Sequence, residues 1–598
     1  MKRKDFLRIS TGLPFILYSG IGCKNMSDTR LFPVAHAFPP RAERPYPSGV
    51  WLEAVKQAGY SHVILMNNPF HDFRLVDIWS FTTGPHAGRL QTWIEKMSEM
   101  VSQYNLKLSM ILWEPRMPVP GPQSQLPPHW TRIEDPPKRW ERWIIKINSV
   151  PEAREWMLNG FKMILEKAPS LDTFILGTND NQVIWELESE TNSPAILMAE
   201  FYRDLYNNCR QIRPSTIIPY SWNWDITYNE PIFSSLPAGT PIVTRIERGT
   251  MYTPDILHPE WSGIVQDMAM GPDTLGNEFE EALNMRKNYN TQLITMISLS
   301  GMFEGWDIPY IPAIGQMLSK FDKMREQKVT GWVDYDCGGI HEGLMTDLVK
   351  VVQSHPKASK QEWQRLIATN RYGEDAVSNA ISAWNNFDHG IKAYPAVVGF
   401  PPPGRTEFNL IAFILGHVPM MPFFQELIFL ADNYERLTAY SRDPHYWLHS
   451  DALPVFLTLI KKAVPFAEKG FQHYKNILQK TSLTETCRKN AQKDTDIAEL
   501  AMLSWQSVEN FFEWAAAVKG IDTERDLSGI LQSEIGVTSR YRELALRPEL
   551  QVGNMTWLTS GEIRNIANSV NPDNDTDRKN KGQDWYQWKI DHLRRQLP

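Results

Sequence analysis

The stretch Gln292–Asp307, QLITMISLSGMFEGWD, begins as an apolar run and passes directly into polar and aromatic residues. An amphipathic stretch precedes it at Glu278–Asn288, and another follows it at Ile314–Gln327. Apolar residues that change from a short continuous run to helical spacing predict a buried strand between two helices.

The same unit recurs from Leu31 to about Leu344. The apolar runs are Leu31–Ala37, His62–Met66, Leu106–Leu112, Thr173–Leu176, Thr216–Ser221, Pro241–Ile246, Gln292–Leu299 and Val329–Val333. The other helical stretches between them are Val50–Ala58, Leu90–Tyr104, Pro151–Ala168 and Ala199–Ile212. Eight such runs predict an α/β fold, a (β/α)8 TIM barrel over residues 31–344. A doubly wound open sheet is the alternative, but no glycine-rich phosphate turn follows an early strand.

Two further regions follow the barrel. Apolar residues continue at helical spacing in Glu362–Ala368, Ala376–Asn386, Phe424–Tyr440, Pro454–Leu478 and Ala491–Lys519. This pattern predicts an α-helical domain over residues 345–545. Residues 546–598 form a polar C-terminal tail, which from about Asn571 is rich in Asn, Asp and Lys and predicts loop or mobile structure.

Composition narrows the class of partner. The 598 residues carry a formal net charge of −7, and no basic block appears after the N-terminus, which argues against nucleic acid. The chain also contains 22 Trp, 20 Tyr and 26 Phe. Aromatic rings dominate protein cores, but flat rings also stack on the apolar faces of sugars. The excess of tryptophan is therefore compatible with a carbohydrate-binding protein.

The N-terminus resembles an export signal over residues 1–23. Basic residues in MKRKDFLR precede a short apolar stretch, Ile9–Gly22, which is too short to cross a bilayer and ends at Cys23. Gly20–Cys23 resembles a loose lipobox in which Cys23 is lipidated, and a plain cleaved signal is the alternative. We expect an exported protein, a cell-envelope lipoprotein or a periplasmic protein of a bacterium, that meets the membrane only through this anchor.

In a TIM barrel the active site lies at the C-terminal ends of the strands. The side chains that follow the predicted strands are mostly acids, amides, arginines and tryptophans. They are His36; Asn67; Trp113, Glu114 and Arg116; Asn179 and Asp180; Trp222, Asn223, Trp224 and Asp225; Arg245 and Glu247; Glu304, Trp306 and Tyr310; Trp332, Asp334 and Asp336. Such a rim suits a site that hydrogen-bonds many hydroxyls and stacks on sugar rings.

Cleavage of a glycosidic bond usually needs two carboxyl groups, one to protonate the leaving oxygen and one to attack or to activate water. Asp180 and Glu304 are the best candidates. Their places resemble those of the largest clan of barrel glycosidases, in which an Asn-preceded acid/base follows strand four and a nucleophile follows strand seven. That clan has Glu where this chain has Asp180, so the resemblance leaves open an inverting mechanism or another role for Asp180.

A second resemblance covers roughly Phe174 to Pro395. Phe303–Pro312, FEGWDIPYIP, is similar to a segment of bacterial glycosidase-like barrel lipoproteins, and Arg371–Gly373 lies in a stretch that resembles the helical domain of α-glucuronidases and hexosaminidase-type enzymes. The resemblance implies a glycoside hydrolase without naming its substrate. The adjacent Asp-Glu pair of hexosaminidases is absent after the fourth strand, which argues against catalysis assisted by an N-acetyl group.

Each candidate residue also has a structural interpretation. Asp180 can cap the following helix. Asp334 and Asp336 lie two residues apart and share one strand face, so one of them can be the catalytic base and the other a salt-bridge partner. Arg245 and Arg248 can bind a uronate or a sulfate on the sugar, but an ion pair with Glu247 is the simpler interpretation.

The remaining candidates have the same ambiguity. His36 can be a sugar ligand or a buried core histidine. The tryptophans Trp222, Trp224, Trp306 and Trp332 can be stacking platforms or core residues.

Other function classes fit less well. A metal-dependent barrel hydrolase needs His-x-His after the first strand, but His36 stands alone, so we predict neither a metal nor another cofactor. A serine or cysteine nucleophile lacks its elbow motif. The prediction is a glycoside hydrolase acting on an oligo- or polysaccharide, and the alternative is a surface lipoprotein that binds glycans without cleaving them.

Overall fold

The computed structural model describes residues 30–40, 43–66, 69, 76–118, 126–133, 142–177, 193–220, 226–252, 263–265, 270–271, 274–301, 304–305, 308–334, 339–394, 398–399, 423, 453–521, 523, 525–552 and 585–597. Eight parallel strands close into a barrel, and they follow one another around it in chain order. They are β1 (Val34–Ala37), β2 (His62–Leu65), β3 (Lys107–Trp113), β7 (Leu171–Gly177), β8 (Thr216–Tyr220), β9 (Pro241–Arg245), β12 (Gln292–Ile297) and β13 (Gly331–Asp334). Each of the eight predicted runs overlaps one of these strands, so the predicted TIM barrel is confirmed.

The barrel closes where β13 pairs with β1. Gly331 lies opposite Val34 in this pair, and a Cβ atom on Gly331 would lie 2.0 Å from the Val34 carbonyl oxygen. No residue with a side chain fits at this approach without moving the backbone. Gly331 is therefore a requirement of the closure.

Helices follow every strand of the barrel. They are α2 (Gly49–Ala58), α3 (Ile78–Thr82), α4 (Ala87–Gln103), α5 (Pro151–Lys167), α7 (Pro194–Arg210), α8 (Asn229–Ser235), α9 (Asn277–Tyr289), α10 (Ile314–Glu326) and α11 (Leu344–Ser354). Helix α8 and a preceding 3-10 turn occupy the interval between Ile217 and Ile242, where the helical pattern is weakest. The 3-10 turns are Pro128–Trp130, Ile226–Tyr228, Glu374–Ala376 and Pro548–Leu550.

Local sequence sets the ends of several helices. The Ser48 hydroxyl accepts a hydrogen bond from the Trp51 amide at the start of α2, and Gly59 ends this helix with a φ of 96°. Ser359 and Glu362 form a reciprocal capping box at the start of α12 (Lys360–Tyr372). These caps satisfy backbone groups that the first and last helical turns leave without partners.

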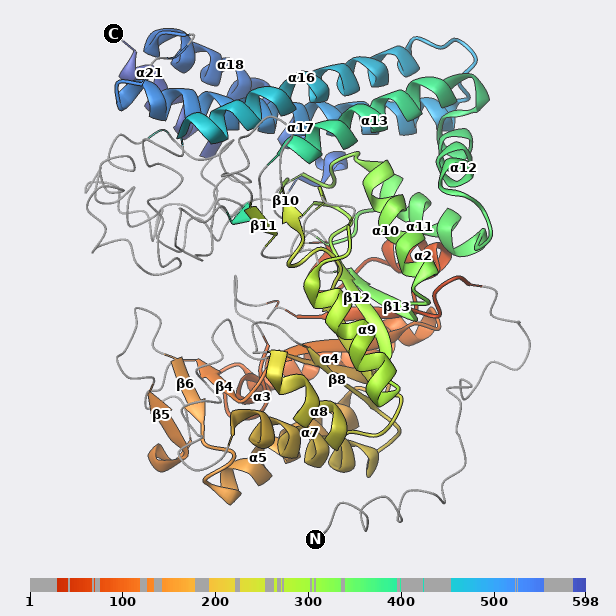
Figure 1. The fold of residues 1–598 in the computed structure, drawn as a ribbon, viewed down its shortest axis with the longest axis vertical. Coiled ribbons are helices and arrows are strands. Elements are labelled where there is room, and N and C mark those ends of the chain that lie inside the picture. Colours follow the sequence, from red (N-terminus) through yellow and green to blue (C-terminus); the bar gives the residue numbers. More distant parts are fainter. Residues whose placement is uncertain are drawn as a thin grey trace.

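The helical domain forms a layer across one side of the barrel (Figure 1). It contains α12, α13 (Val377–Ala393), α16 (Leu453–Leu478), α17 (Glu485–Val518) and α18 (Leu527–Ala545). Helices α13, α16, α17 and α18 pack on one another in this order. Four of the predicted helical stretches overlap these helices, and the fifth, Phe424–Tyr440, lies outside the described residues.

The tail prediction is wrong for one segment. Trp585–Gln596 forms the helix α21, which packs on α18. Tyr586, Ile590 and Leu593 recur at helical spacing and are buried, while Lys589 is fully buried in an ion pair with Glu534. The polar composition of the preceding residues obscured this apolar face, which ties the C-terminal segment to the helical domain.

A buried polar cluster connects the barrel to the helical domain. Asp494 of α17 is fully buried and accepts hydrogen bonds from Arg371 Nη2 at 2.8 Å and from the Tyr372 hydroxyl at 2.6 Å. Tyr310, which precedes α10 in the barrel, also donates to this carboxylate. Buried charges in proteins are normally paired in this way, because an isolated one is costly.

Two small sheets were not predicted. One contains β4 (Arg116–Pro118), β6 (Arg142–Ile145) and β5 (Thr131–Ile133) in the connection between β3 and α5. The other contains β10 (Met251–Tyr252), β11 (Gly263–Val265) and β14 (Val398–Gly399). Strand β14 follows α13, so this sheet joins the helical domain to the connection between β9 and α9.

Candidate active site

Glu304 lies in the connection that follows β12 (Gln292–Ile297), at the end of the barrel where a TIM barrel carries its active site. Its side chain is almost fully buried, with 2% of the residue exposed. Oε1 accepts a hydrogen bond of 2.8 Å from the Met270 amide, and Oε2 is buried with no hydrogen-bond partner in the described part of the chain. The Met270 amide thus holds one carboxyl oxygen, while the other oxygen remains able to form a hydrogen bond with another group.

The surroundings of Glu304 favour its protonated form. Burial raises the pKa of Glu304 to about 7, against opposing contributions from the Met270 amide and the Lys320 ammonium group. The negative charge of Glu247 adds a smaller increase. A carboxyl group with a pKa near neutrality can both donate and accept a proton at physiological pH, which is the property required of a general acid/base.

Glu247 and Lys320 form an ion pair beside Glu304. Glu247 follows β9 and Lys320 lies on α10, and both are buried, at 0% and 1% exposed. Their charges act on Glu304 with opposite signs. The connections after β9 and β12 therefore each carry a buried carboxyl group, and Lys320 pairs with that of Glu247.

The predicted ion pair between Arg245 and Glu247 is wrong. Arg245 Nη2 lies 2.8 Å from Glu278 Oε2, and Arg248 Nη1 lies 3.0 Å from the same oxygen. Glu278 stands in the first turn of α9, and the two guanidinium groups hold its pKa below its ordinary value against the opposing effect of burial. The two arginines thus connect α9 to the end of β9 through Glu278. Glu247 pairs with Lys320 instead.

Trp113 and Glu114 lie at the end of β3. A Cβ atom on Gly177, at the end of β7, would lie 2.5 Å from the Trp113 ring, so the indole occupies the space above this glycine. Glu114 is 3% exposed, and its Oε1 accepts a hydrogen bond of 2.6 Å from the Ile78 amide at the start of α3. Glu114 thus stabilises the β2–α4 connection, a role that the sequence did not indicate.

His36 is a core histidine. Its Nδ1 lies 2.8 Å from the Ser109 hydroxyl, its ring stacks on that of His62 with centroids 4.4 Å apart, and the residue is fully buried. Burial, with the nearby His62, holds the pKa of His36 well below its ordinary value, so the ring is neutral at physiological pH. This burial and these contacts agree with the core-histidine interpretation of His36.

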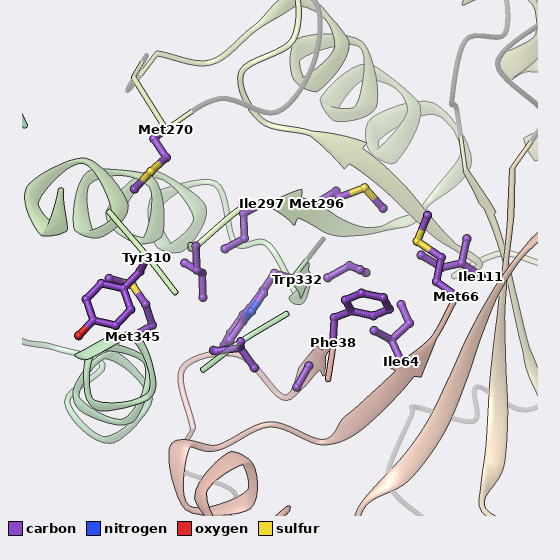
Figure 2. Close-up of a cluster of buried hydrophobic side chains, with 14 of the residues drawn as sticks. Phe38, Ile64, Met66, Ile111, Met270, Met296, Ile297, Tyr310, Trp332 and Met345 are labelled. Atoms are coloured by element: carbon purple, nitrogen blue, oxygen red, sulfur yellow. The ribbon is translucent and has the colours of Figure 1, made fainter. Parts of the chain in front are cut away.

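Trp332 and Tyr310 are also corrected. Trp332 is fully buried and packs edge-on against Phe32, Phe321 and Tyr60, with ring centroids 5.5, 5.1 and 5.6 Å away. Figure 2 shows its indole within the buried apolar cluster. Tyr310 is fully buried and donates to Asp494. Neither ring has an open face for a sugar.

Asp334 is fully buried at the end of β13. Its Oδ1 accepts a long hydrogen bond of 3.4 Å from the Leu299 amide. Burial and the negative charge of Asp334 raise the pKa of the Tyr60 hydroxyl well above its ordinary range. Asp334 therefore lies beside Tyr60 in the barrel core, and its predicted role as a catalytic base or a salt-bridge partner stays a prediction.

The other predicted site residues lie outside the described residues. They are Asn67, Asn179, Asp180, Trp222, Asn223, Trp224, Asp225, Trp306 and Asp336, together with the side chain of Arg116 and the lipidation candidate Cys23. Their roles remain predictions.

Lys320 was not predicted from the sequence as a residue of the site. Within α10 it is three residues from Met317 and four from Met324, both buried, so a lysine lies in an apolar helical stripe. A charged residue in such a stripe needs a buried partner. The lysine in this apolar stripe was therefore the sequence feature that could have indicated a buried ion pair. Met270 was also missed, because it contributes only a backbone amide.

Comparisons with known proteins agree with this fold. No protein-family model and no curated protein matches the chain. Among solved structures, a GH138 enzyme targeting pectin rhamnogalacturonan II is similar over 87% of this chain and 63% of its own, with 8% identity and a TM-score of 0.51. A chitobiase of Flavobacterium johnsoniae is matched over 86% of this chain and 78% of its own, with 10% identity and a TM-score of 0.35.

The structural neighbours are thus glycoside hydrolases, and at these identities the likeness concerns the fold. This chain spans 63% of the length of the GH138 enzyme. The barrel followed by a helical domain is the part of the prediction that this likeness supports.

Proposed function

We propose that the protein is a glycoside hydrolase in which Glu304 donates the proton to the leaving glycosidic oxygen. The observation that carries this proposal is the state of Glu304: buried at a strand end of a glycosidase-like barrel, with one oxygen fixed, the other without a partner in the described part of the chain, and a pKa raised to about 7. The clan resemblance implies a nucleophile at this place. The raised pKa favours a proton donor instead, because a nucleophile must be ionised.

The second carboxyl group has two candidates. Asp180 is the group predicted from the sequence, in the connection that follows β7. Glu247 is the alternative within the part of the chain that the structure describes, since it is paired with Lys320 and its charge acts on Glu304. Two carboxyl groups whose environments favour different protonation states supply the acid and the base or nucleophile of a glycosidase.

The order of events follows from these roles. Glu304 protonates the glycosidic oxygen as the bond to the anomeric carbon breaks, and the second carboxylate either attacks that carbon or takes a proton from the attacking water. A separation of about 5–5.5 Å between the carboxyl groups goes with retention of configuration, and about 6.5–9.5 Å with inversion. The first anomer released, observed by NMR, therefore distinguishes the two roles of the second group.

The test of the proposal is a screen of the purified protein against plant and host glycans, with released sugars identified by mass. The panel includes rhamnogalacturonan II, the substrate named for the GH138 enzyme. We expect cleavage of at least one glycan. Binding of glycans without release of any sugar would contradict the proposal and support the glycan-capture alternative.

We also propose that the protein is exported and anchored through Cys23. None of the described helices combines the length and the apolar character that a membrane span needs. Residues 1–29 lie outside the described part of the chain. Labelled palmitate should enter the wild-type protein but not Cys23→Ser when both are expressed in a bacterium, and equal labelling would contradict the anchor.

A further inference from the structure

The last turn of α13 lies against the backbone that holds Glu304. The amide of Met270 donates to Glu304 Oε1, and the Ile391 carbonyl oxygen lies 3.1 Å from where a Cβ atom on the adjacent Gly271 would be. Downstream of α13, Val398 and Gly399 pair with Val265 and Ile264. The helical domain therefore packs on the same connection, between β9 and α9, that fixes Glu304.

Tyr394 caps the C-terminal end of α13 at this contact. Its ring stacks on Trp505 of α17, with centroids 5.1 Å apart and planes inclined by 22°. The residue is 3% exposed, and its hydroxyl is buried with no hydrogen-bond partner among the described residues. Packing thus fixes the ring while leaving the hydroxyl unsatisfied.

The Tyr394 hydroxyl and Glu304 Oε2, which both belong to this region, are buried and have no hydrogen-bond partner among the described residues. Each such atom destabilises the folded protein, so native structures rarely leave one unexplained. Burial, and then the negative charge of Glu304, raises the pKa of Tyr394 well above its ordinary value. The phenol therefore stays protonated at physiological pH and remains a hydrogen-bond donor.

We propose that Tyr394 of the helical domain completes the sugar-binding site, with its hydroxyl and Glu304 Oε2 flanking the position of one hydroxyl group of the substrate. We expect a water molecule at this position in the free protein, which the sugar hydroxyl replaces on binding. The proposal rests on the proposed glycosidase function, and it gives the helical domain a direct part in that function. Tyr394 binds substrate, and Glu304 transfers the proton.

The first test uses a crystal structure of the unliganded wild-type protein. We expect an ordered water within hydrogen-bonding distance of both the Tyr394 hydroxyl and Glu304 Oε2. A direct hydrogen bond between the two groups, or a Tyr394 hydroxyl satisfied by another residue, would overturn the proposal. This test needs no substrate, so it decides the proposal even if the wild-type protein cleaves no glycan in the screen.

The second test compares Tyr394→Phe with the wild-type protein on a glycan found in the screen. We expect kcat/KM to fall by about 10- to 100-fold, because the sugar hydroxyl loses a buried donor. The midpoint of urea unfolding should be unchanged or higher, since the phenylalanine removes an unsatisfied hydroxyl. Wild-type kcat/KM in this variant would overturn the proposal.

Tyr474→Phe is the matched control. Its hydroxyl, also buried in the helical domain, accepts a hydrogen bond of 2.8 Å from Trp384 Nε1. This variant should lose stability while keeping kcat/KM. An inactive wild-type protein would instead contradict the glycosidase function, whereas an active wild-type protein with an equally active Tyr394→Phe variant would contradict only the role of Tyr394.

Discussion

Glu304→Gln is expected to lower the rate of glycoside hydrolysis by about 10²- to 10⁴-fold, the usual contribution of a general acid/base. Glutamine keeps the shape of the side chain and can still accept from the Met270 amide, but it does not transfer a proton. Initial rates of sugar release, measured near pH 6, give the factor. A variant that retains the wild-type rate would remove Glu304 from the mechanism.

The same substitution should stabilise the protein in a pH-dependent way. The pKa of Glu304 is raised from 4.5 to about 7, so the folded protein keeps a proton that the unfolded chain releases between these values. Stability from this group is fully present below pH 4.5 and is lost as the pH rises through about 7. Glu304→Gln should therefore match the wild-type protein near pH 4 and exceed its unfolding free energy by up to about 3 kcal/mol at pH 8.

Asp388→Asn provides the control for these two effects. Asp388 on α13 is buried, accepts from the Gln316 amide at 3.1 Å, and has a pKa raised to about 7 by burial. Its substitution should give a similar pH-dependent gain in stability while leaving hydrolysis close to the wild-type rate. Urea unfolding at pH 4 and pH 8 measures the gain, and a gain from Glu304→Gln that is independent of pH would contradict the raised pKa.

Asp494→Ala is expected to destabilise the protein by about 3–5 kcal/mol, the usual effect of removing one partner of a buried ion pair. The substitution leaves the Arg371 guanidinium buried without its main partner and removes the acceptor of the Tyr310 and Tyr372 hydroxyls. Because these residues come from the barrel and from two helices of the helical domain, we expect both domains to lose stability. Urea unfolding followed by tryptophan fluorescence measures the loss.

Asp347→Ala removes the other, more exposed ion pair of Arg371. Asp347 lies 2.5 Å from Arg371 Nη1, but 40% of its side chain is exposed. Solvent screens such a pair, so we expect a loss of at most about 1 kcal/mol. Equal losses in the two variants would show that burial of Asp494 does not determine its contribution.

The barrel could be predicted from the sequence because each strand is a short apolar run next to a helical pattern. Gln292–Ile297 illustrates this, since all its residues after Gln292 are buried and Glu304 follows within one short connection. The helix α21 shows the limit of composition, because three apolar residues in a polar segment were enough to bury it against α18. The sheet that contains β14 could not be predicted because it pairs strands more than a hundred residues apart.

The candidate site was predicted only in part. A residue that follows a strand is placed by the barrel itself, as with Glu304 and Glu247. Partners supplied by helices or by another domain, such as Lys320 and Tyr394, depend on tertiary packing that local patterns do not describe. The same reason explains why the sequence left His36 and Trp332 open between a sugar site and the core, and why Tyr310, which is buried against Asp494, was assigned to the site.

The most direct test of the glycosidase account is the pH dependence of kcat/KM for a glycan identified in the screen. The account predicts that activity falls as the pH rises through about 7, because Glu304 must be protonated to donate to the leaving oxygen. It also predicts that Glu304→Gln loses most of the activity, and that the remaining activity no longer falls as the pH rises through about 7. The account would be contradicted if Glu304→Gln kept a rate close to that of the wild-type protein and showed the same fall of activity near pH 7.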